Sequence, residues 1–108
     1  MEIKESDWKI FRRLHSIALE RYCQRVLEEV RAAAECEGDY HDCYRKVYRL
    51  IRNRDKTLAL AFDDRRRSTA FVLLANMIDE DLVTEEELKQ FSSEAQEHIA
   101  AINDLRPT

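Results

Sequence analysis

The sequence predicts an all-α protein, a single-domain bundle of four or five helices over residues 1–108. Apolar residues recur at intervals of three and four along most of the chain, which is the spacing of one helix face. The chain has one glycine and one proline, where average usage would give about 13 of the two together. Hairpin turns and phosphate-binding loops need glycine at positive φ. Extensive antiparallel sheets, Rossmann folds and P-loops are therefore disfavoured.

The first expected helix spans residues 7–36. Its apolar stripe runs from Phe11 to Ala33, and charged residues occupy the other side. Ser6 stands at the expected N-cap position. Gly38, the only glycine, stands where a left-handed C-terminal cap is expected.

The second expected helix spans residues 40–62, and the third spans 68–79. Asp39 and Ser68 are the expected N-caps, because a short polar side chain satisfies a free backbone N–H at a helix start. The third helix is apolar on nearly every side from Ala70 to Ile78. Such a helix belongs in the middle of a bundle or across a subunit contact, since one flank alone cannot bury it.

The last two expected helices span residues 85–91 and 93–103. Thr84 followed three residues later by Glu87 predicts a capping box at the start of the first. Whether the two helices are continuous depends on Ser92-Ser93, which can break the run because serine favours caps over helix interiors.

Composition excludes several other classes of protein. The longest fully apolar run has six residues, 70–75, against the roughly 20 that a membrane helix needs. The first residues lack the basic start and apolar run of a secretion signal. The three cysteines are an odd number and lack the spacing of a disulfide framework. We therefore expect a cytoplasmic protein that does not enter a membrane.

Three residues around the glycine are weak candidates for metal ligation: Cys36, His41 and Cys43. Zinc takes four nitrogen or sulfur ligands, and Cys-x4-His-x-Cys does not have the paired spacing of a zinc motif. Cys43 also falls in the apolar stripe of the second helix, where a cysteine acts as a small core residue. A reactive thiol at Cys36 is the remaining alternative.

No arrangement of residues predicts catalysis. The few serines have cap or surface positions, and His15 lies one turn after Phe11 on the core side of the first helix. A buried, hydrogen-bonded histidine is the favoured interpretation over a catalytic base. We therefore expect neither an enzyme nor a cofactor.

The charge distribution is the feature that most suggests function. Residues 45–67 contain nine basic and three acidic residues, a net charge of +6 in a chain whose total is −4. Such a surface can bind phosphates or the acidic surface of another protein. The alternative is a solvated helix face. The candidate residues form a stripe on the second helix, extended by the following loop: Arg45, Arg49, Arg52, Lys56, Arg65, Arg66 and Arg67.

Two further features are polar or aromatic. The charges of Arg54 and Asp55 interrupt the apolar stripe of the second helix, and an inward charge needs a partner. We expect a buried polar clasp with Asp63 or Asp64, and a functional pocket is the alternative. Trp8 is expected to be the lid of the bundle, with an aromatic anchor for a partner as the alternative.

These features predict a non-enzymatic protein-interaction or regulatory module. One form of it is a homodimer through the third helix or the Trp8 end, because the third helix is apolar all round. The first alternative is a nucleic-acid-binding protein that uses the basic stripe. It is disfavoured by the acidic total and by the lack of a known nucleic-acid-binding motif. The second alternative is a metal-binding bundle.

Overall fold

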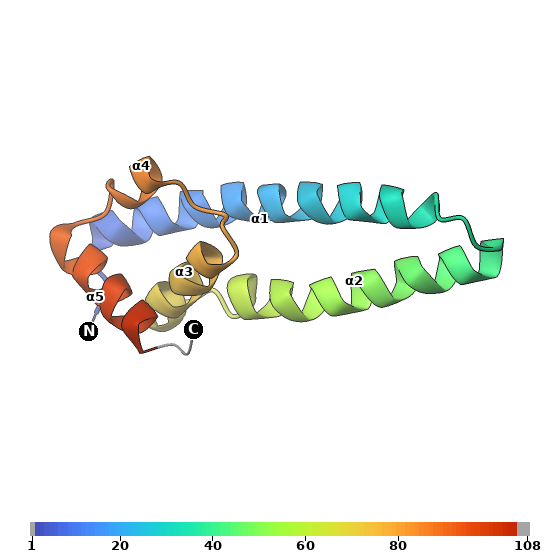
Figure 1. The fold of residues 1–108 in the computed structure, drawn as a ribbon. Coiled ribbons are helices and arrows are strands. Elements are labelled where there is room, and N and C mark those ends of the chain that lie inside the picture. Colours follow the sequence, from blue (N-terminus) through green and yellow to red (C-terminus); the bar gives the residue numbers. More distant parts are fainter. Residues whose placement is uncertain (1, 106–108) are drawn as a thin grey trace.

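The computed structural model describes residues 2–105, which form helices and no strand, so the all-α prediction is confirmed. The helices are long at the start of the chain and short at its end (Figure 1). Within the described range, no helix is both long enough and apolar enough to span a membrane. In chain order, the elements are α1 (Glu5–Ala34), α2 (Tyr40–Phe62), the 3-10 helix η1 (Arg67–Thr69), α3 (Ala70–Asp79), α4 (Glu85–Leu88) and α5 (Ser93–Asp104).

α1 and α2 form a long antiparallel hairpin, and the three short helices gather at one end of it (Figure 1). The molecule measures 53 × 27 × 23 Å, with a radius of gyration of 16.5 Å. A compact chain of this length would have a radius of gyration of about 13 Å. The protein therefore consists of a lobe and an arm. The lobe contains the three short helices and the adjoining parts of α1 and α2, and the rest of α1 and α2 extends from it as the arm.

The hydrophobic core lies in the lobe. α3 packs against α1, α2 and α5, and six of its ten residues are buried. The other buried apolar side chains come from Ile3 before α1, from one face each of α1, α2 and α5, and from the loops beside α4. Besides Ile3 they are Phe11, Leu14, Ala18, Tyr22, Ala61, Phe62, Leu82, Phe91, Ala95 and Ile99.

The all-round hydrophobicity of α3 is thus satisfied within one chain. Three helices cover it, and Val72 is its one large apolar side chain left exposed. The central position expected for this helix is confirmed, whereas a subunit contact is not needed to bury it. The apolar surface of α3, which suggested a homodimer, is accounted for by packing against α1, α2 and α5 of the same chain.

The ends of α1 differ from the expected ones. The helix begins after Lys4, and Ser6 lies inside its first turn. Lys4 is held near the lobe by an ion pair with Glu94, at 2.6 Å. At the other end, Gly38 does not have a positive φ, so it is not a left-handed cap. A disulfide bond described below closes this turn instead.

Two aspartates adopt the left-handed conformation that glycine would favour. Asp64, after α2, has φ 61°, and Asp81, after α3, has φ 58°. At Asp81 the backbone N–H bonds to Ile78 O, and the next N–H, of Leu82, bonds to Met77 O. This is a Schellman motif, with an aspartate in place of the usual glycine.

Most of the other predicted caps are confirmed. The Asp39 side chain accepts the backbone N–H of Asp42 at 2.8 Å, and Thr84 and Glu87 form the expected capping box. The break between α4 and α5 is present, and Ser92 is the N-cap of α5. The expected cap at Ser68 is wrong, because this residue lies within η1.

Candidate functional site

Beyond the lobe, the two long helices form an arm that encloses no full core. We define the arm as residues 23–60, which include the loop that joins α1 to α2. Cys43 is the one buried residue within it. Two helices can shield only the sides that they turn toward each other, so the remaining apolar side chains of the arm stay in contact with solvent.

An apolar groove runs along one face of the arm, between α1 and α2. It encloses about 310 Å³ near the lobe. The polar side chains in its lining are those of Arg54 and Asp55, and Tyr22 closes its inner end. We call this the arm groove, and its aliphatic and sulfur-containing lining residues are Cys23, Val26, Leu27, Val30, Ile51 and Leu58.

The apolar surface of the groove is exposed and continues toward the arm tip. Leu27 is 60% exposed and Ile51 is 43% exposed. Tyr44 and Tyr48 precede Ile51 by seven and three residues, which places all three on one side of α2. The tyrosines are 69% and 57% exposed. A contiguous surface of this kind is typical of an interaction site.

The opposite face of the arm, toward α3, is polar. Arg54 donates two hydrogen bonds to Glu29 of α1, at 3.1 Å from Nε and 2.7 Å from Nη2. This ion pair lowers the pKa of Glu29, chiefly through the hydrogen bond from the guanidinium group. A polar hollow lies here too, and Arg25 and Glu80 belong to its lining.

The predicted polar clasp therefore forms with a different partner. The expected mates of Arg54, Asp63 and Asp64, lie beyond the end of α2 and are exposed. Asp64 instead accepts a hydrogen bond from Arg66 at 2.8 Å. The inner side of α2 meets α1, so Arg54 reaches Glu29, while Asp55 is exposed at the groove.

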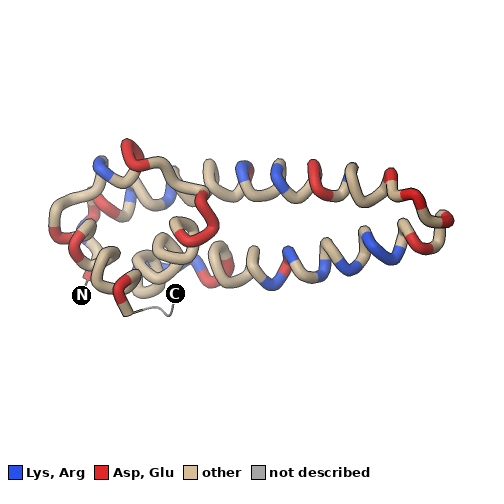
Figure 2. Tube along the Cα trace, viewed as in Figure 1, with Lys and Arg blue, Asp and Glu red and all other residues tan. Residues whose placement is uncertain are grey.

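The basic stripe of α2 lies on the arm, and all four of its residues are exposed. Its members are Arg45, Arg49, Arg52 and Lys56, and Figure 2 shows the concentration of basic residues along this helix. None of the four takes part in an ion pair with another described residue. The stripe is thus an uncompensated positive surface beside the groove.

The arginines of the loop after α2 do not extend this stripe. Arg66 pairs with Asp64, and Arg67 pairs with Glu5 of α1 at 2.6 Å. Arg65 is exposed in the same loop. The loop belongs to the lobe, so the structure separates these three residues from the arm.

Trp8 is half-buried on the lobe, where its ring stacks on Phe11 at 5.6 Å between centroids. The guanidinium groups of Arg12 and Arg67 lie 5.9 and 5.3 Å from its ring centroid. Its contacts are therefore supplied within the chain, as expected of a lid.

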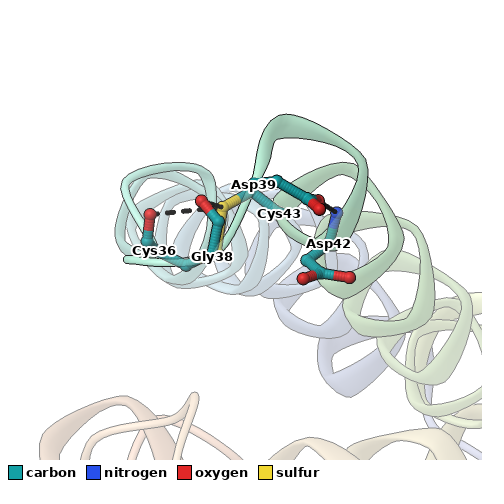
Figure 3. The surroundings of a disulfide bond; sticks show 5 residues. All are labelled: Cys36, Gly38, Asp39, Asp42 and Cys43. Carbon is teal, nitrogen blue, oxygen red and sulfur yellow. Dashed lines mark hydrogen bonds between the residues drawn. A yellow bond between two sulfur atoms is a disulfide. The ribbon is translucent and has the colours of Figure 1, made fainter.

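The cysteines at the arm tip do not form a metal site. Cys36 and Cys43 are joined by a disulfide bond, with Cα atoms 5.7 Å apart (Figure 3). His41 is exposed, and no group of three potential ligands occurs among the described residues. The expectation that the cysteines stay unpaired is wrong for these two, because the turn between the helices brings them together.

Cys43 Sγ also lies near two backbone carbonyl oxygens of the turn. Cys43 Sγ lies 3.2 Å from Cys36 O and 3.8 Å from Gly38 O. These contacts are hydrogen bonds only when Cys43 is a thiol, since a disulfide sulfur carries no proton. The turn thus offers acceptors to the reduced form as well.

Two buried polar side chains have structural roles. His15 Nε2 donates to Phe62 O at 2.9 Å, which fits the predicted core histidine. Asp7 is 2% exposed and accepts two hydrogen bonds from Ser92. The burial of Asp7 was not predictable from the sequence, because a carboxylate in the first turn of a helix is favoured there by the helix dipole without any buried partner.

The arm groove was also not predicted from the sequence, although the relative lengths of the expected helices indicate it. A helix rises about 1.5 Å per residue, so the first two expected helices are far longer than the later three. The later helices therefore cannot cover them along their full length.

Comparison of the chain with protein-family models, with curated proteins and with solved structures found no match.

Proposed function

We propose that this protein is a non-enzymatic interaction module that binds another protein along the arm groove. The observation that carries the proposal is the contrast between the two ends of the hairpin. Its apolar stripes are buried in the lobe, whereas in the arm the same stripes are only half-buried or exposed. An amphipathic helix placed in the groove would complete a three-helix core, a common mode of peptide recognition.

The polar groups support binding rather than chemistry. The buried side chains of Asp7 and His15 are engaged by Ser92 and by Phe62 O. The charged groups at the groove, Arg54 and Asp55, do not form a nucleophile–base pair of the kind that covalent catalysis needs.

Nucleic-acid binding through the basic stripe is the second candidate function. The unpaired cations favour it, since they would displace counterions from a phosphate backbone. The acidic residues at the arm tip oppose it, because Glu35, Glu37, Asp39 and Asp42 lie in the turn and the first residues of α2, beyond the end of the stripe. Figure 2 shows acidic residues gathered at this tip.

Site-specific photocrosslinking tests the proposed function. A photoreactive phenylalanine analogue is placed at Leu27 or Tyr48 in the arm, or at Val72 in the lobe as a control of matched exposure. Each variant is irradiated in the native host. We expect the same protein adduct from both arm positions, and none from the control. The adduct should disappear with excess unlabelled protein but persist with excess Leu27→Glu protein.

Two results would contradict the proposal. One is an adduct pattern that is equal at the arm and at Val72, which would show unspecific contact. The other is no protein adduct at either arm position, which would show that the groove stays unoccupied. Circular dichroism of each variant confirms that the helices are intact.

A further inference from the structure

The proposed function leaves open which kind of protein surface fills the groove, and the following inference rests on that function. We propose that the occupant is an amphipathic helix with acidic residues along one side. Its apolar side fills the arm groove, and its carboxylates lie against the basic stripe of α2.

The stripe and the groove are neighbours on the same helix. Tyr48, on the groove side, is three residues after Arg45 and four residues before Arg52. Side chains at these spacings are adjacent on a helix surface. A helix that contacts Tyr48 and Ile51 therefore places its own flanking residues next to the guanidinium groups of Arg45 and Arg52, the two members of the stripe nearest the groove.

In the described part of the chain, the cations of the stripe lack the carboxylate partners that four cations around the lobe have. Lys4, Arg21, Arg66 and Arg67 each have a carboxylate partner within 2.6 to 2.8 Å. The four stripe residues have no such partner among the described residues. Two acidic residues of α2 lie nearby: Asp55, which lines the groove without an ion pair among the described residues, and Asp42, three residues before Arg45. The net positive charge is thus available to a ligand.

The α1 side of the arm has no comparable bias. A shallow hollow along its outer face is lined by Glu20, Arg21, Glu28 and Arg31, an even mixture of charges. Electrostatic complementarity therefore selects acidic residues only on the flank of the ligand that faces α2. Such complementarity governs specificity and association rate more than affinity.

A second copy of the chain and a nucleic acid fit these observations less well. Two arms paired with α2 against α2 would bring two basic stripes together, and like charges opposite each other are unfavourable. Pairing of α2 with α1 would offer the stripe only the mixed charges of the outer α1 face. A nucleic acid would leave the aliphatic groove between Leu27 and Ile51 unfilled.

A defined peptide library tests the inference. It displays amphipathic helices with a randomised apolar seam, and each flanking position carries Glu, Gln or Lys. We expect binders of the wild-type protein to be enriched in Glu along one flank. Their affinity should fall about tenfold in the Arg45→Glu/Arg52→Glu variant, since each exposed ion pair contributes roughly 1.4- to 5-fold. Lys in place of the facing Glu in the peptide should restore it.

The matched control carries the same change of charge outside the arm. The Lys9→Glu/Lys89→Glu variant alters two exposed lysines of the lobe and should leave peptide affinity unchanged. The Leu27→Glu variant, which places a charge in the groove, should abolish binding of the selected peptides.

The remaining outcomes separate this inference from the proposed function. Binders that need Leu27 but carry Gln or Lys flanks would overturn the acidic ligand and leave the groove as the binding site. A library without any Leu27-dependent binder would contradict both. Two further results would overturn the acidic helix. One is salt-sensitive binding of duplex DNA or RNA that depends on Arg45 and Arg52 but not on Leu27. The other is a dimer in sedimentation equilibrium that Leu27→Glu dissociates.

Discussion

Asp7 and Ser92 are 85 residues apart in the chain and are joined by two hydrogen bonds. The backbone N–H of Ser92 donates to Asp7 Oδ1 at 2.9 Å, and its hydroxyl donates to Asp7 Oδ2 at 2.7 Å. The same hydroxyl accepts the N–H of Ala95 as the N-cap of α5. The carboxylate therefore fixes the start of α5 to the first turn of α1.

Replacing Asp7 with alanine should lower the free energy of unfolding by about 2 kcal/mol. The substitution removes hydrogen bonds to a charged group and leaves the Ser92 N–H without its partner. Urea denaturation monitored by circular dichroism measures the change. Glu20→Ala, an exposed site on the same helix, is the control and should change stability by less than about 0.5 kcal/mol. Equal effects of the two variants would contradict a structural role for Asp7.

Glu87 should make the stability of the lobe depend on pH. Arg21 donates two hydrogen bonds to its carboxylate, at 2.7 and 2.9 Å. The Arg21 hydrogen bond is the main cause that lowers the pKa of Glu87 from 4.5 to about 2. The unfolded chain binds this proton more readily, so the stabilisation is present above pH 4.5 and is lost as the pH falls toward 2.

The Glu87→Gln variant measures this contribution. Glutamine keeps the capping box but cannot form the ion pair. We expect the free energy of unfolding of the wild type to exceed that of the variant by about 1–2 kcal/mol near neutral pH. The difference is no larger because partial exposure to solvent screens the ion pair. The difference should be small at about pH 2 and vanish below it, once Glu87 is protonated in the folded protein as well. Glu86→Gln, on the exposed side of α4, should show no such trend, and a difference that is constant with pH would contradict the assignment.

The disulfide bond should stabilise the tip of the arm. Native protein should have one reactive thiol, that of Cys23, and three after reduction. The bond joins residues seven positions apart, and closing a loop of this size contributes about 2–3 kcal/mol. Reduction or Cys36→Ser should speed hydrogen exchange in residues 35–47 while the lobe is unchanged. Three reactive thiols in native protein would rule out the bond.

The left-handed aspartate after α3 predicts a stabilising substitution. Asp81 has φ 58°, a conformation that costs an L-residue about 1–2 kcal/mol and glycine almost nothing. Asp81→Gly should raise the free energy of unfolding by about 0.5–1 kcal/mol, after the added flexibility of the unfolded chain is deducted. Glu80→Gly, at φ −86°, should destabilise by a similar amount. Thermal denaturation of both variants tests whether the two substitutions change the stability in opposite directions.

Several features were predictable because they depend on residues close in sequence. The capping box of Thr84 and Glu87 needs only three residues of separation, and the N-cap at Asp39 needs the same. The partner of Arg54 was not predictable in this way. Its mate Glu29 lies 25 residues away on α1, and the expected aspartates were chosen for their nearness in the chain.

The prediction of the site was partial for a related reason. The basic stripe follows from a spacing of three and four residues on α2, and the structure places it on an exposed surface. The prediction that the stripe extends into Arg65–Arg67 is wrong, because Arg66 pairs with Asp64 and Arg67 pairs with Glu5 in the lobe. The disulfide was missed because cysteine spacing alone does not show that a helical turn brings two sulfurs together.

The sequence by itself determined that this protein is helical, roughly where each helix lies, and which side of it is apolar. These properties arise from backbone hydrogen bonds and side-chain periodicity within a few residues. Only the tertiary structure decided which part of each apolar stripe is buried, because that depends on how far the short helices reach along the long hairpin. They cover the lobe and leave the arm open, and the exposed groove is the consequence.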